Sequence, residues 1–132
     1  MDVICPYELK FNKGDAGLDL RSSLGCLLEV LKPTLIPLGI AAAIPEGYVA
    51  ILKDRSGLAS KGIHVIGGVI DSSYRGEWKA ILIALNKSYL VVPGERVCQA
   101  IFIKYNHYEI NEVDTLDTTD RGEAGFGSTG TL

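Results

Sequence analysis

Asp71 lies in the stretch GGVIDSSYRGEW (residues 67–78), after two apolar positions and shortly before Tyr74. A carboxylate in such a turn can act as a general base, and a flat tyrosine ring can pack against a sugar. The paired glycines Gly67 and Gly68 let backbone approach a ligand closely. The alternative is an ordinary β-hairpin with Asp and Ser in its loop.

A second group of candidate residues suits anions or cations. Asp19 lies between two leucines, so on a strand its carboxylate faces away from them. It is either a solvated strand residue or a group that holds a metal or a metal-bound water, since hard divalent cations prefer oxygen ligands. Arg55 and Ser56 stand beside Gly57 in DRSGLAS, where backbone amides can approach an anion.

Two further stretches contain residues that are unusual for their surroundings: a polar glutamine in an apolar run, and a glycine-rich segment near the C-terminus. Gln99 interrupts the apolar stretch RVCQAIF, and a buried glutamine needs partners from another strand or from a ligand. RGEAGFGSTG (residues 121–130) has the glycine spacing of a P-loop, but Ser128 replaces the lysine and too few residues follow Thr129 for a helix. The P-loop is therefore excluded, and a mobile tail is the simplest alternative.

Composition limits the class of protein. A chain of 132 residues fits one domain, and three cysteines without C-x-x-C spacing indicate reduced thiols rather than disulfides or a zinc site. His64 and His107 have no companion at ligand spacing. The net charge of -3 gives no basic field for nucleic acid. Without a signal pattern or a membrane-length apolar run, we expect a cytoplasmic protein, or one made in a host cell's cytoplasm.

The elements that must position these residues are short strands. Apolar, β-branched runs alternate with Gly, Pro, Asn and Asp, which predicts an all-β barrel or jelly roll, with at most one or two helical turns in SGLASKG. WKAILIALN is apolar at nearly every position, so we expect burial against another subunit and hence a homo-oligomer. From about Leu116 the periodicity is lost, which indicates an arm leaving the body.

The stretches AGLDL, RSGLAS, GGVIDSSYRGEW, ERVCQAIF and RGEAGFGSTG occur in this order between residues 16 and 130. Together they resemble the five motifs of the trimeric dUTP pyrophosphatase (dUTPase) family. The resemblance implies a distorted β-jelly-roll, with a barrel domain over residues 1–115 that forms a homotrimer. It also implies a mobile arm over residues 116–132 that closes over a neighbouring subunit's active site. The implied activity is Mg²⁺-dependent hydrolysis of dUTP to dUMP and diphosphate.

The resemblance also implies roles for single residues. Asp71 resembles the base that activates water for attack on the α-phosphorus, Tyr74 the ring packed on the deoxyribose, and Asp19 the carboxylate that contacts Mg²⁺ through water. The groups implied around the substrate are Arg55, Ser56 and Gly57 at the phosphates, Gln99 near the α-phosphate, Val65, Val69, Ile70 and Lys79 near the uracil, and Arg121, Phe126, Gly127, Ser128 and Thr129 on the arm.

Three residues depart from the family's pattern. Asp54 stands where proline is usual, so it either adds a negative charge near the phosphates or pairs with Arg55. Val65 stands where many relatives have a polar asparagine, so base recognition rests on backbone groups. Cys98 replaces a common alanine and is small enough to be tolerated. Two alternatives stay open: a dCTP deaminase of the same fold, and a module that binds dUTP as a sensor.

Overall fold

The structure is a computed structural model that describes residues 1–126 and 128, and within these the regular elements are almost all strands. The prediction of an all-β fold is confirmed. In chain order the elements are β1 (Val3–Ile4), β2 (Leu18–Arg21), β3 (Cys26–Leu28), β4 (Thr34–Pro37), β5 (Ala41–Ala42), β6 (Tyr48–Lys53), α1 (Ser56–Ala59), β7 (Ile63–Ile66), β8 (Val69–Ile70), β9 (Lys79–Ala84), β10 (Tyr89–Val91) and β11 (Arg96–Lys104).

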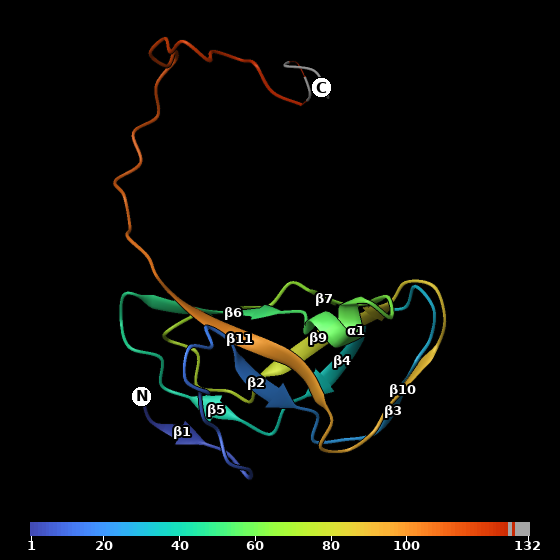
Figure 1. Cartoon of the computed structure of the whole chain (residues 1–132). Coiled ribbons are helices and arrows are strands. Elements are labelled where there is room, and N and C mark those ends of the chain that lie inside the picture. Colours follow the sequence, from blue (N-terminus) through green and yellow to red (C-terminus); the bar gives the residue numbers. More distant parts are fainter. Residues whose placement is uncertain (127, 129–132) are drawn as a thin grey trace.

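The strands form two main sheets and two two-stranded ribbons, which together make up the body of the protein in Figure 1. One sheet has the order β2-β11-β6-β8, and the other has the order β4-β9-β7. The ribbons pair β1 with β5 and β10 with β3. Every pair between these strands is antiparallel. Because the order of the strands in each sheet differs from their order in the chain, neighbours in space are often distant in sequence, and residues from several strands can meet in one site.

Alternation along the strands sets which side chains face the core. In β2 the leucines are buried while Asp19 is partly exposed, as the sequence predicts. In β9, Ala80, Leu82 and Ala84 are buried, and the intervening isoleucines are only partly buried. The outer face of this sheet is therefore apolar. Leu35, paired with Ile81, is 61% exposed there.

The stretch from Gly67 to Trp78 is not the regular hairpin that its sequence suggests. After Gly68, which has a φ of +90°, strand β8 pairs with β6, whereas the following strand β9 belongs to the other sheet. Residues 71–78 therefore cross between sheets, and we call them the Asp71 loop. The helical turn expected in SGLASKG is confirmed as α1.

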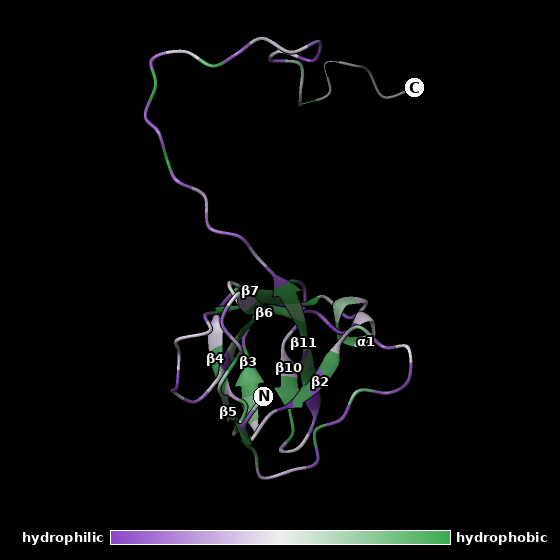
Figure 2. Ribbon diagram, turned by 90° about the vertical axis from the view of Figure 1, so that its left-hand side faces the viewer, coloured by the Kyte–Doolittle hydropathy of each residue, from purple (hydrophilic) through white to green (hydrophobic). Residues whose placement is uncertain are grey.

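The chain leaves the body where β11 ends at Lys104 and continues as an extended segment (Figure 1). The sequence predicts an arm from about residue 116, and the chain is already extended and exposed over residues 106–115, with Tyr108 and Ile110 at 80% and 88% exposed. Tyr105 is still held on the body, where its N–H donates to the carbonyl of Gly47 at 2.9 Å. Figure 2 shows this segment as mostly hydrophilic, in contrast to the green strands of the body. Among the described residues, no helix is long and apolar enough to cross a membrane.

Candidate functional site

A polar cavity of about 640 Å³ lies between β2, β11 and the start of α1. It brings together most of the residues that the sequence assigns to phosphates and metal. Its lining carries both charges, since it includes Lys10 and Arg55 as well as Asp15 and Asp19. The lining residues are Lys10, Asn12, Gly14, Asp15, Ala16, Gly17, Asp19, Arg55, Ser56, Gly57, Gln99 and Ile101.

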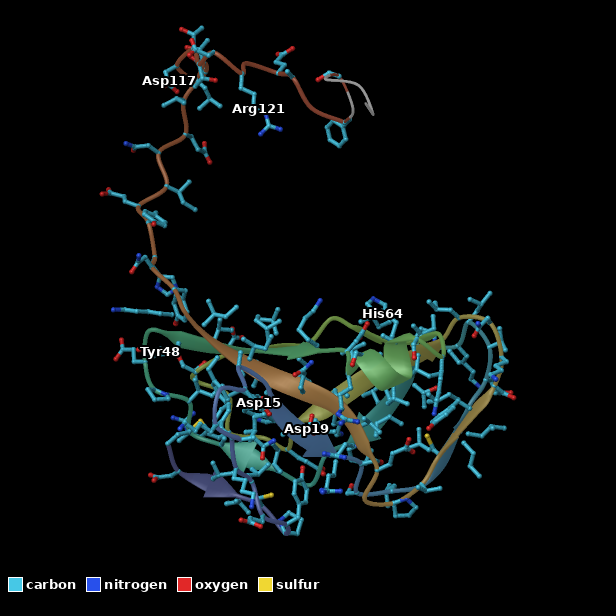
Figure 3. All side chains as sticks on the ribbon, viewed as in Figure 1. Asp15, Asp19, Tyr48, His64, Asp117 and Arg121 are labelled. Atoms are coloured by element: carbon cyan, nitrogen blue, oxygen red, sulfur yellow. The ribbon has the colours of Figure 1, made fainter. Side chains whose placement is uncertain are left out.

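The carboxylate of Asp19 holds two arginines at the edge of this cavity. Arg55 Nε donates to Asp19 Oδ1 at 2.8 Å, and Arg96 Nη1 donates to Oδ2 at 3.1 Å. Arg55 Nη1 also donates to the carbonyl of Arg96 at 3.3 Å. The guanidinium of Arg55 is thus oriented before any ligand binds, which lowers the entropic cost of gripping an anion. Figure 3 shows Asp15 and Asp19 on the side of the body where the polar cavity lies.

The turn that follows Arg55 supplies backbone donors. Ser56 and Gly57 form the first turn of α1, where helix N–H groups have no intrahelical acceptor. Both residues are exposed and line the cavity, so their amides can donate to a ligand oxygen. The cavity therefore combines an oriented guanidinium with adjacent backbone donors, a combination suited to a phosphate group.

The side-chain amide of Gln99, which is partly buried, has a partner in the segment that follows β6. Its Nε2 donates to the carbonyl of Asp54 at 2.8 Å, and the residue also lines the cavity. A Cβ on Gly17 would lie only 1.9 Å from Gln99 Oε1. A residue without a side chain is therefore required at position 17 for Gln99 to hold this orientation.

Asp54 does not pair with Arg55, and this corrects one of the two sequence-based alternatives. Its Oδ2 accepts from His64 Nδ1 at 2.7 Å, and its Oδ1 accepts from the backbone N–H of Val65 at 2.6 Å. Its side chain is absent from the lining of the polar cavity. Val65 itself is buried in the core, and its N–H is committed to Asp54.

A smaller cavity of about 220 Å³ lies at the Asp71 loop. It brings together Val69, Ile70, Asp71, Tyr74 and Lys79 as the sequence predicts, and adds Glu77. The loop is braced internally, because Tyr74 Oη donates to the carbonyl of Glu77 at 3.1 Å and the N–H of Tyr74 donates to the carbonyl of Asp71 at 3.1 Å. Gly76 is required here, since a Cβ would lie 2.4 Å from Tyr74 Oη.

The two cavities share no residue within one chain. The strand register explains why. Gln99 is opposite Lys53, whereas Ile70 is opposite Ala50, so Asp71 lies further along the sheet and two strands away. With strands about 4.8 Å apart and a rise of about 3.3 Å per residue, Asp71 and Gln99 are roughly 15 Å apart in one chain.

The arm residues lie apart from both cavities. Figure 3 shows Arg121 at the far end of the extended segment, away from Asp19 on the body. Its Nε donates to the carbonyl of Ala124, and the N–H of Ser128 donates to the carbonyl of Gly125. Phe126 is fully exposed. The predicted contacts of Gly127 and Thr129 concern residues outside the described part of the chain.

Sequence reasoning missed Arg96, Lys10 and Asn12. Arg96 opens the strand that carries Gln99, and a cation at the start of an otherwise apolar strand was the available signal. Lys10 and Asn12 line the cavity from the segment before β2, which has no regular structure and gave no signal.

No cluster of three or more His, Cys, Asp or Glu side chains able to hold a metal is found among residues 1–126 and 128. A carboxylate has about four lone-pair sites. Each carboxylate oxygen of Asp19 accepts a hydrogen bond from an arginine, which leaves further lone pairs free to accept. The Asp19 side chain is 35% exposed. It therefore fits contact with a cation through water rather than a direct site made of several protein ligands.

The fold and the two cavities define an all-β protein with a polar cavity lined by Arg55 and a separate loop that carries Asp71. A family model described as dUTPase matches residues 7–130, so this chain belongs to the dUTPase family.

Relatives of this chain carry the name deoxyuridine 5'-triphosphate nucleotidohydrolase. The one from Finegoldia magna is 47% identical over 123 residues, which is 89% of this chain and 86% of the relative. The one from Fusobacterium nucleatum is 44% identical over 124 residues, with 89% and 85% covered. Among solved structures, the Staphylococcus bacteriophage 80alpha dUTPase with dUPNHPP is 27% identical, covers 98% of both chains and has a TM-score of 0.88.

Proposed function

We propose that this protein hydrolyses dUTP to dUMP and diphosphate. The observation that carries the proposal is the oriented Arg55 beside Ser56, Gly57 and Gln99 in one polar cavity, in a chain that matches the dUTPase family along nearly its whole length. The relatives' name supports the same substrate. The alternative of a dCTP deaminase has no support from these relatives.

In the proposed reaction, Asp71 removes a proton from a water molecule, whose oxygen attacks the α-phosphorus. The bond between the α-phosphorus and the bridging oxygen to the β-phosphorus breaks, and diphosphate leaves with that oxygen. Asp71 is exposed at the smaller cavity, so both water and substrate can reach it. Arg55 and the amides of Ser56 and Gly57 bind the phosphates and stabilise the negative charge. Gln99 lies near the α-phosphate.

The Asp71 loop sets the proposed selectivity. Tyr74 packs against the deoxyribose and leaves no room for a 2′-hydroxyl. Backbone groups around Val69 and Ile70, with Lys79 beside them, bind the uracil edge and reject cytosine, because its amino group would face a donor. Val65 contributes through the strand that it anchors. Its side chain is buried and its N–H is already used.

The distance between the cavities supports a site shared between subunits, and the resemblance to the family implies that the assembly is a homotrimer. Asp71 and Gln99 both act at the α-phosphorus in this proposal, yet they are roughly 15 Å apart in one chain by strand spacing. Asp71 of one subunit must then work with Arg55 and Gln99 of another. The exposed apolar face around Leu35 supports such an assembly. The arm of a subunit closes over the site through Arg121, Phe126 and Ser128.

We further propose that Mg²⁺ takes part with the substrate. A cavity with two cations and two carboxylates suits a triphosphate whose charge is already reduced by a divalent ion. Asp19 would contact the ion through water. The ion supplies charge neutralisation and orientation of the α-phosphorus. The proposed place of action is the cytoplasm.

The test is diphosphate release by the purified protein with Mg²⁺, comparing dUTP, dTTP, dCTP and UTP at equal concentration. We expect rapid release from dUTP alone. Asp71→Asn should lower kcat by about 10²–10⁴-fold, the usual contribution of a general base, while binding of a non-hydrolysable dUTP analogue is kept. Analogue binding without hydrolysis by the wild-type protein would indicate a sensor, and ammonia release from dCTP would indicate a deaminase.

A further inference from the structure

Asp54 occupies the junction between β6 and α1, directly before the phosphate-binding turn of residues 55–57. Its carboxylate is turned toward β7, where it accepts from His64 Nδ1 at 2.7 Å and from the N–H of Val65 at 2.6 Å. Because an ionised carboxylate only accepts hydrogen bonds, the imidazole must carry a proton on Nδ1. Both carboxylate oxygens are therefore engaged on the side away from the polar cavity.

These bonds join two different sheets. Strand β6 belongs to the sheet β2-β11-β6-β8, whereas β7 belongs to β4-β9-β7. The Asp54 side chain is only 24% exposed, so its hydrogen bonds are partly shielded from water. The carbonyl of the same residue accepts from Gln99 Nε2 at 2.8 Å. Asp54 thus contacts Gln99 on β11 and two residues of β7, and it directly precedes the turn that carries Arg55.

We propose that Asp54 is a positioning residue for the phosphate-binding turn, an inference that deepens the proposed function and rests on it. Asp54 fixes the backbone between β6 and α1 through a side chain anchored on β7. Its negative charge is matched by the donors from His64 and Val65 and is kept out of the cavity.

The test compares Asp54→Ala and Asp54→Asn with a matched control, Glu46→Ala, which removes an exposed carboxylate from another turn. We expect Asp54→Ala to raise the KM for dUTP about tenfold, because a displaced turn binds phosphates poorly. The kcat should change far less, since the carbonyl that holds Gln99 is retained. Asp54→Asn keeps an acceptor for the N–H of Val65 and should restore most of the affinity. Glu46→Ala should match the wild type.

An unchanged KM in Asp54→Ala would overturn the inference. If kcat in that variant also falls in proportion to the unfolded fraction, measured by urea denaturation, the role of Asp54 is purely structural. If the wild-type protein releases no diphosphate from dUTP, the proposed function fails by itself. In that case the affinity for dUTP, measured by calorimetry, decides the inference. An affinity about tenfold lower in Asp54→Ala would support it, and an unchanged affinity would contradict it.

Discussion

At the residue scale, the carboxylate of Asp19 organises the charges of the polar cavity. It binds Arg55 and Arg96 with one oxygen each, and all three side chains are partly exposed. Exposed ion pairs contribute little to stability, so the value of this cluster lies in the geometry that it fixes. Of these three side chains, Arg55 is the one whose orientation affects ligand binding, because it lies beside the amides of Ser56 and Gly57.

Cys98, next to Gln99 on β11, gives a prediction about pH. Burial, with a smaller contribution from the Asp19 carboxylate, raises the pKa of its thiol from 9.0 to about 12. The folded state therefore keeps a proton that the unfolded chain loses above pH 9. The resulting stabilisation is complete below that pH and is lost as the pH rises toward 12, at about 1.4 kcal/mol per pH unit.

The measurement is the free energy of unfolding in urea between pH 8 and about pH 11 for the wild type and Cys98→Ala. We expect the stability of the wild type relative to the variant to fall steadily above pH 9. The pKa of Tyr7 is also raised, mainly by burial, and most of this contribution cancels between the two proteins, because the charge of Cys98 is only a minor cause of it. Parallel pH profiles for the two proteins would contradict the prediction.

Strand alternation predicted the outward direction of Asp19, and the resemblance to the dUTPase family implied the grouping of Val69, Ile70, Asp71, Tyr74 and Lys79, which line one cavity. Neither could predict the partner of Asp54. His64 is ten residues away on a strand of another sheet, so their contact depends on how the sheets pack. Spacing in sequence carries no information about such a contact. Arg96 was missed because its contact with Asp19 depends on β11 lying beside β2, which local patterns do not specify.

At the element scale, the pairing of β8 with β6 places the Asp71 loop, and Gly68 makes that pairing possible. The N–H of Leu52 donates to the carbonyl of Gly68 at 2.8 Å. A Cβ on Gly68 would lie 3.0 Å from both the Cβ and the carbonyl oxygen of Leu52, at a φ of +90°. Gly47 has a similar φ of +82° but open space around it, so it is a matched control.

We expect Gly47→Ala to lower the free energy of unfolding by about 1 kcal/mol, the cost of a left-handed backbone for alanine. Gly68→Ala should cost more, because the new methyl group also displaces Leu52, and it should lower turnover of dUTP by shifting the Asp71 loop. Urea denaturation and steady-state kinetics measure both effects. Equal losses of stability with unchanged turnover in both variants would show that the contact with Leu52 is unimportant.

Strand alternation and turn residues predicted the all-β class and the short helical turn, because both signals are local. These local signals could not predict the order in which the strands pair. The stretch GGVIDSSYRGEW has the pattern of a hairpin, yet its two flanking strands join different sheets. A strand of two residues has too few side chains to specify its partner by pattern, so the rest of the fold determines it.

At the scale of the whole molecule, the apolar outer face of the sheet β4-β9-β7 predicts association. We expect light scattering to give three times the chain mass of 14.2 kDa. Leu35→Glu places a charge on that face, where Leu35 is 61% exposed, and should yield smaller species with little dUTP hydrolysis. Leu116→Glu adds the same charge on the arm and should keep the trimeric mass. A monomeric wild type that is fully active would contradict the assembly.

The extended segment after β11 also affects how fast the proposed arm would close over a site and open again. Residues 105–120 tether Arg121 and Phe126 to the body, and a coil of this length spans about 22 Å from end to end. Tethering holds these groups near the sites at an effective concentration in the millimolar range. Contacts that would be too weak between separate molecules are then sufficient for closure. Weak contacts also break quickly, so the same tether allows each product to leave soon after it forms.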